Sequence, residues 1–141
     1  MEELIEQLSV LLENKVGRLA EVAQILEEAD VRIRSMVLAD TSEFGILRLI
    51  ADQSETAYQA LKTRGYTAGR TRVAAVGVGE NPGGLRSALA LLEKQTINVE
   101  YMYAFPRCGQ ENVMVFRFDK TEEAANILRA GGFRVFSPSE I

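Results

Sequence analysis

The chain has 141 residues, of which 47% are hydrophobic and 26% are charged, and its formal net charge is −4. This length suits one ordinary domain or two very small ones, and the composition excludes disordered and fibrous proteins. Because there is no histidine and only one cysteine, Ser-His-Asp and Cys-His catalysis, zinc sites with histidine ligands and internal disulfides are excluded, while the acidic balance argues against non-specific binding to nucleic acid or anionic membranes.

The first half of the chain alternates strand and helix patterns. A short loop ending in Gly17 precedes a predicted helix, because apolar residues recur at helical spacing from Leu19 to Ala29. Ser54 is predicted as the N-cap of a second helix and Gly65 as its C-terminal stop. Apolar runs and a period of two predict strands at 4–12, 31–39, 44–51 and 66–71.

The second half follows the same order of patterns. A helix is predicted from Leu85 to Leu92, and Thr121 and Gly132 are expected to begin and end another. Strands are predicted at 72–79, 97–105, 112–118 and 133–137. The strand at 97–105 is expected to show an open apolar sheet face, formed either by Ile97, Val99, Tyr101, Tyr103 and Phe105 or by Met102 and Ala104.

The second half is a repeat of the first. The segment Glu13–Leu19 aligns with Gly79–Leu85 at an offset of 66 residues, and after one inserted residue Gly65 aligns with Gly132 at an offset of 67. Two domains are therefore predicted, at residues 1–70 and 71–141, joined near Thr71. Each has the order β-α-β-β-α-β, which is the α+β, ferredoxin-like arrangement of an antiparallel four-stranded sheet with two helices on one face.

The loop before the first helix of each unit carries a recognisable motif. The segments Asn14–Leu19 and Glu80–Leu85 resemble the D-x-P-G-x-L signature of ACT domains, and the stretches 40–49 and 98–105 are similar to tandem members of that family. The chain departs from the signature at its first position, where it has Asn14 and Glu80 instead of aspartate. The resemblance implies two small ferredoxin-like modules of a type that binds amino acids and regulates metabolic enzymes or transcription factors.

The resemblance also implies where a ligand would bind. In ACT proteins the ligand often lies between this loop and a strand of a neighbouring unit, which implies a homodimer or side-by-side packing of the two halves. Glycine in the loop allows close approach of a ligand, and the helix start offers free N–H groups to a carboxylate. The alternative interpretation of each loop is a tight turn that only starts a helix. The candidate ligand-binding residues are Asn14, Lys15, Val16, Gly17, Arg18, Leu19, Ser35 and Met36 in the first unit, and Glu80, Asn81, Pro82, Gly83, Gly84, Leu85, Tyr101 and Met102 in the second.

Two other patterns have competing interpretations. The glycines of Gly77–Gly84 imitate a dinucleotide-binding fingerprint, but the third glycine comes one position too late and Glu80 would repel a pyrophosphate. Tyr101, Tyr103 and Phe105 alternate as in a base-stacking platform, yet the acidic chain lacks the accompanying basic motif, so packing in a core or interface is favoured. Neither a cofactor nor a metal is expected.

The expected function is that of a non-catalytic regulatory protein that binds an amino acid or a close analogue at ACT–ACT interfaces. The alternative is a ligand-free interaction module for an enzyme of amino-acid metabolism, and an enzyme of the same fold is disfavoured by the absence of histidine. A cytoplasmic location is expected, because acids stand at the start of the chain where a signal peptide needs bases. The homodimer is what the resemblance to ACT domains implies. Cys108 is interpreted as an incidental thiol.

Overall fold

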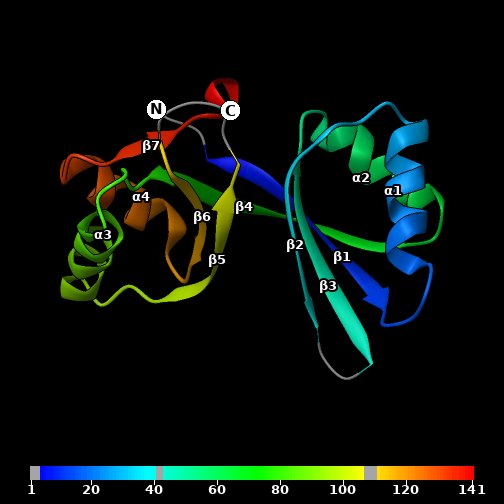
Figure 1. Ribbon diagram of the computed structural model, residues 1–141, viewed down its shortest axis with the longest axis horizontal. Coiled ribbons are helices and arrows are strands. Elements are labelled where there is room, and N and C mark those ends of the chain that lie inside the picture. Colours follow the sequence, from blue (N-terminus) through cyan, green and yellow to red (C-terminus); the bar gives the residue numbers. More distant parts are fainter. Residues whose placement is uncertain (1–3, 41–42, 107–110) are drawn as a thin grey trace. The chain divides into compact units, whose positions relative to one another are not determined.

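The computed structural model describes residues 4–40, 43–106 and 111–141 (Figure 1), so Cys108 lies outside the described residues. The chain divides into two compact units. The N-terminal repeat is Glu6–Thr71, and the C-terminal repeat is Arg72–Ile141 together with the start of the chain up to Ile5. No helix in these described ranges is long and apolar enough to span a membrane.

The N-terminal repeat has the predicted order of elements. It consists of β1 (Ile5–Glu13), α1 (Arg18–Glu28), β2 (Ile33–Asp40), β3 (Phe44–Ala51), α2 (Ser54–Thr63) and the first part of β4 (Thr67–Gly77). Its strands lie in the order β4-β1-β3-β2, and β3 pairs antiparallel with both β1 and β2. Strand β2 therefore forms an edge beside β3.

The C-terminal repeat has the same topology. It consists of the rest of β4, then α3 (Gly83–Lys94), β5 (Val99–Phe105), β6 (Val113–Phe118), α4 (Thr121–Ala130), β7 (Arg134–Phe136) and a short 3-10 helix η1 (Pro138–Glu140). Its strands lie in the order β7-β4-β6-β5, and all neighbours are antiparallel. The ferredoxin-like, α+β prediction is confirmed for both repeats. The expectation of two separate strands around Thr71 is wrong, because Thr67–Gly77 forms one strand without a turn between its parts.

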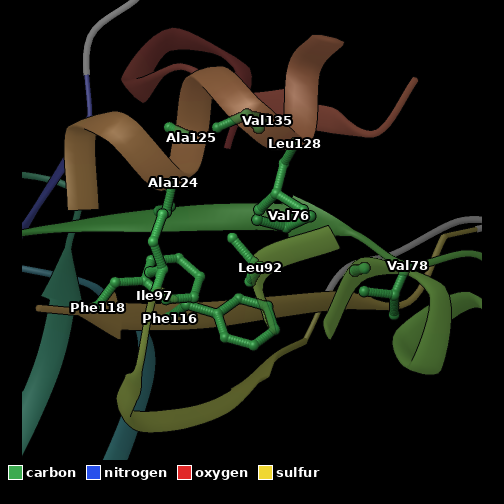
Figure 2. Packing of buried hydrophobic residues seen from close by; sticks show 12 residues of the cluster. Val76, Val78, Leu92, Ile97, Phe116, Phe118, Ala124, Ala125, Leu128 and Val135 are labelled. Atoms are coloured by element: carbon green, nitrogen blue, oxygen red, sulfur yellow. The ribbon is translucent and has the colours of Figure 1, made fainter. Parts of the chain in front are cut away.

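Each repeat has its own hydrophobic core between sheet and helices. In the N-terminal repeat, alternate β1 residues Leu8, Val10 and Leu12 pack with Val22 and Ile25 of α1. In the C-terminal repeat, side chains of β4, β6, α3 and α4 converge (Figure 2), and the rings of Phe116 and Phe118 stack with centroids 5.2 Å apart. The residues labelled there are Val76, Val78, Leu92, Ile97, Phe116, Phe118, Ala124, Ala125, Leu128 and Val135.

Strand β5 changes which residues face the helices partway along its length. Ile97, Val99 and Met102 all pack in the same core. In a regular strand, Met102 would point to the face opposite to that of Ile97 and Val99. The cause is an irregularity in the pairing with β6 between Val99 and Tyr101. Tyr101 beyond it pairs with Arg117 on the opposite face. Neither predicted series of open-face residues is therefore correct. The irregularity divides the first series between the two faces, and Met102 of the second series packs against the core.

All four long helices end with the same hydrogen-bond pattern. The residue after the C-cap has a positive φ, and its N–H and the next N–H bond back to carbonyls of the last turn. Gly65 and Gly132 fill this position as predicted, whereas α1 and α3 use Asp30 and Thr96. The N-cap predictions are wrong for Ser54 and Thr121, which are the first helical residues. Their hydroxyls instead hydrogen bond to the Glu6 carboxylate and the Phe118 backbone.

Replacing Thr96 by glycine is expected to raise the free energy of unfolding by about 1 kcal/mol. Thr96 has φ +58°, and a β-branched side chain is strained there, whereas glycine adopts this conformation freely. Asp30→Gly is the matched control, because Asp30 has φ 57° at the equivalent helix end and aspartate tolerates this region better. Urea unfolding measures both changes, and a Thr96→Gly gain no larger than that of Asp30→Gly would contradict the assignment of strain.

Candidate ligand site

The loop between β1 and α1 is held by charge pairs around Glu13. Lys15 Nζ lies 3.4 Å from Glu13 Oε2, and Arg18 Nε donates a hydrogen bond of 3.2 Å to Glu13 Oε1. The ammonium of Lys15 and then the Arg18 guanidinium hold the pKa of Glu13 below its ordinary value. The backbone N–H of Asn14 donates to the carbonyl of Glu43, which ties the loop to the start of β3. Both cations of the loop are therefore paired with a carboxylate of the same loop.

A small hollow of about 80 Å³ opens beside this loop. Four of the predicted site residues line it, namely Asn14, Lys15, Arg18 and Leu19. Val16 and Gly17 do not: Val16 is fully exposed, and Gly17 has φ +90° as the N-cap of α1. The remaining lining residues are Leu12, Glu13, Leu38, Asp40 and Gly45.

The strand residues predicted for this site lie elsewhere on β2. Ser35 is buried and Met36 is 41% exposed, and neither lines the hollow. The residues of β2 that line it are Leu38, which is on the same face as Met36 but two positions closer to the loop, and Asp40. The end of β2 lies beside the loop because Asp40 pairs with Gly45 of β3. This pairing register could not be derived from the residue pattern alone.

The loop between β4 and α3 is held by backbone contacts and by a glycine. Asn112 Nδ2 donates a hydrogen bond of 3.0 Å to the carbonyl of Gly79, and the Val78 N–H donates to the carbonyl of Asn112. A Cβ added to Gly84 would lie 1.8 Å from the Val78 carbonyl oxygen, so only glycine lets the first turn of α3 pack here. Gly83, which begins α3, has open space around it.

A larger hollow of about 540 Å³ opens beside this second loop. It is lined by four predicted residues, Glu80, Asn81, Pro82 and Leu85, but not by Gly83, Gly84, Tyr101 or Met102. The strand contributes Ala104 instead, two residues beyond Met102. The other lining residues, which sequence reasoning missed, are Val78, Gly79, Phe105, Pro106, Glu111, Asn112, Val113 and Met114.

The two hollows occupy equivalent places in the two repeats. At the offset of 66 residues, Leu38 corresponds to Ala104 and Arg18 to Gly84, while past the inserted residue Gly45 corresponds to Asn112. The internal alignment therefore pairs the missed residues of one hollow with those of the other, but it does not mark either set as part of a site. Leu38 therefore stands in the smaller hollow where Ala104 stands in the larger one.

The second hollow presents groups that suit both ends of an amino acid. Helix α3 has no side-chain cap and no acidic residue in its first turn, from which Leu85 lines the hollow. The Gly84 N–H already donates to the Asn81 carbonyl, so the remaining N–H groups at the start of the helix can receive a carboxylate. Glu80 and Glu111 line the same hollow and can accept hydrogen bonds from an ammonium group. Among the residues that the structure describes, no group of three or more histidine, cysteine, aspartate or glutamate residues is placed to hold a metal ion.

Other hollows in the C-terminal and N-terminal repeats offer less. One, of about 760 Å³, runs along the exposed side of α3 and is lined by that helix and the adjacent Pro82 alone. Another, of about 360 Å³, includes the Glu13 and Arg18 pair and Tyr66. The first involves no strand, and in the second the charges of Glu13 and Arg18 are already paired with each other.

Comparisons with known proteins agree with this architecture. The ACT domain pair family matches residues 3–133. The crystal structure of protein BT0572 from Bacteroides thetaiotaomicron is 29% identical, with a TM-score of 0.92 over 99% of this chain and 96% of that chain. The ligand-free regulatory subunit of aspartate kinase from Thermus thermophilus is 17% identical, with a TM-score of 0.65 over 92% of this chain and 95% of that chain.

The aspartate kinase subunit shares the fold, and its low identity supports no closer statement. Among curated proteins, none matches the chain. The family match spans nearly the whole sequence and both repeats, including both loop motifs. The chain therefore belongs to the ACT domain pair family.

Proposed function

We propose that this chain is a non-catalytic regulatory protein, in which residues 1–70 and 71–141 act as ACT domains that bind an amino acid or a close analogue. The observation that carries the proposal is the pair of equivalent hollows, each formed by a loop, a helix start and the end of a neighbouring strand. A carboxylate would lie at the start of the helix, and the ammonium group would lie against the oxygen of Asn14 or Glu80. The loop residues Asn14–Leu19 and Glu80–Leu85 are proposed to form the ligand-binding sites.

The binding unit is proposed to be a homodimer in the cytoplasm, with the ligand at an ACT–ACT interface. Val16 in the loop, Leu19 in the first turn of α1, and Met36 and Leu38 on the edge strand β2 are exposed apolar side chains of the N-terminal repeat. Apolar side chains at the edge of a sheet suit burial against another chain. Ligand binding across such an interface would shift the equilibrium between two quaternary arrangements, which is the basis of regulation.

Binding is tested by thermal unfolding and calorimetry with the twenty amino acids and their keto-acid analogues. A ligand present at 100 times its Kd is expected to stabilise the protein by about 2.7 kcal/mol. Ala104→Leu should abolish binding to the C-terminal repeat, because it introduces the leucine that helps to fill the N-terminal hollow. Ala130→Leu, at an exposed position at the end of α4, is the control. No response to any compound from a verified dimer would refute the proposal.

The alternative is a ligand-free module that assembles with an enzyme of amino-acid metabolism. It is favoured by one observation: among the described residues, all exposed large hydrophobic side chains lie in the N-terminal repeat. This alternative predicts a partner enzyme whose binding is unaffected by amino acids. Loss of that partner on changing Leu38 to serine, with no ligand detected, would favour it over the amino-acid sensor.

A further inference from the structure

We propose that the hollow of the C-terminal repeat selects an amino acid with a second positive charge, such as lysine, ornithine or arginine. This inference rests on the proposed function and names the class of ligand for one of its two sites. It is based on the carboxylates around the larger hollow, which contrast with the mixed charges around the smaller one.

Among the described residues, the charged side chains that line the larger hollow are two carboxylates, Glu80 and Glu111. Neither lysine nor arginine is among the described residues that line it. An ordinary amino acid brings one ammonium group, which satisfies one carboxylate, and its own carboxylate is suited to the free N–H groups of α3. A second carboxylate then favours a ligand that carries a second cation.

Among the described residues, the cation that pairs with Glu111 is Arg134, which is held more closely by another carboxylate. Arg134 Nη1 lies 3.7 Å from Glu111 Oε2, whereas Arg134 Nη2 lies 2.8 Å from Glu140 Oε2. Arg134 also stacks on the ring of Phe136, with its guanidinium carbon 4.2 Å from the ring centroid. The stronger pairing to Glu140 lowers the pKa of that carboxyl to about 2. Arg134 is therefore held mainly by Glu140 and the aromatic ring, and Glu111 can accept hydrogen bonds from a ligand.

The position of Glu111 depends on a glycine in the neighbouring strand. A Cβ on Gly77 would lie 2.8 Å from Glu111 Oε1, so the bare backbone of β4 leaves room for this carboxylate. The next residue, Asn112, donates a hydrogen bond from its side chain to the carbonyl of Gly79 in the loop. The second carboxylate therefore lies on a segment that is tied to the binding loop.

The smaller hollow has balanced charges. Glu13 and Asp40 line it together with Lys15 and Arg18, and Glu13 is already paired with both cations. Its volume of about 80 Å³, against about 540 Å³ in the C-terminal repeat, leaves less room for a long side chain. Selection of a basic side chain is accordingly assigned to the C-terminal repeat alone.

The test compares L-lysine with L-norleucine by calorimetry on the full chain, because norleucine has the same carbon chain without the terminal amine. Lysine is expected to bind about tenfold more tightly, as fits one added charge-assisted hydrogen bond. Glu111→Gln should remove the difference in affinity between lysine and norleucine, and Glu80→Gln, in an exposed loop, should weaken both ligands. Glu100→Gln is the matched control, since Glu100 pairs with Arg117 and does not line the hollow.

The possible failures separate the two proposals. Equal binding of lysine and norleucine, or an unchanged preference in Glu111→Gln, would overturn the selection of basic ligands and leave amino-acid binding standing. A complete absence of binding by any amino acid would overturn both proposals. Stronger binding of glutamate than of lysine would show that the helix start, rather than the two carboxylates, determines the class of ligand.

Discussion

The variant Gly84→Ala is expected to lower the free energy of unfolding of the C-terminal repeat by about 3 kcal/mol, the upper part of the range for forcing an extra carbon into a packed site. The added Cβ would lie 1.8 Å from the carbonyl oxygen of Val78 and 3.0 Å from its carbonyl carbon. Both are backbone atoms, so no side chain can rotate away to make room. The helix must move away from the end of β4, which also disturbs the hollow beside Leu85.

Gly83→Ala is the matched control for this variant. Gly83 is the first residue of α3 and has nothing within 4 Å of its added Cβ. Alanine there should change the free energy of unfolding by less than about 1 kcal/mol, because it meets no clash and is favoured over glycine in a helix. Urea unfolding of the full-length protein, followed by circular dichroism, compares the two. Equal destabilisation by both variants, or none by Gly84→Ala, would contradict the steric role of Gly84.

The contrast between these adjacent glycines shows what the motif could predict. Gly17 and Gly83 occupy the same place in the two copies of the motif, and both were expected to serve the ligand. In the structure only Gly17 has a positive φ, whereas the close packing in the second copy depends on Gly84. Arg18 stands at the equivalent position of the first copy, so the two copies use their loops differently. A motif identifies the loop, but the neighbouring backbone decides which glycine is required.

The fold was largely predictable because its signals are local. Apolar spacing in the helices, alternation in the strands and the internal repeat depend only on neighbouring residues, and together they define the β-α-β-β-α-β order. The ends of β2 and β5 at the hollows depend instead on strand pairing. An irregularity at Val99 and Tyr101 changes the face of β5, and no local pattern announces it. Ala104 was missed because the pairing with β6, and not alternation along β5, decides which residue of that face lies beside the loop. Glu111 was missed because it precedes the predicted strand at 112–118.

Phe116→Ala is expected to lower the free energy of unfolding by about 4 kcal/mol, the typical cost of removing a fully buried phenylalanine ring. Phe116 has no exposed surface, stacks on Phe118 and pairs with Ala74 in the middle of β4. Its neighbours come from both sheet and helices (Figure 2), so the cavity cannot close by movement of one element. Such a loss is a large fraction of the stability of an ordinary domain.

The repeat provides the control for this change. Leu49 corresponds to Phe116 at the offset of 67 residues and is equally buried in the other core. Phe116→Leu therefore places a side chain that this fold already uses, and its cost should be about half that of Phe116→Ala, because most of the buried volume is kept. Calorimetric unfolding measures both variants. Equal costs for leucine and alanine would show that the site needs an aromatic ring rather than buried volume.

The same variant connects stability to ligand binding. If Phe116→Ala leaves the C-terminal repeat largely unfolded, its affinity for a ligand falls in proportion to the folded fraction. A ligand at 100 times its Kd can restore only about 2.7 kcal/mol, which is less than the expected loss. Lysine should therefore raise the melting temperature of Phe116→Ala without returning it to that of the unchanged protein.

Since the N-terminal core of Leu8, Val10 and Leu12 is a separate cluster, the variant should leave hydrogen exchange in that core unaltered. Faster exchange in both cores would instead mean that the repeats unfold as one unit.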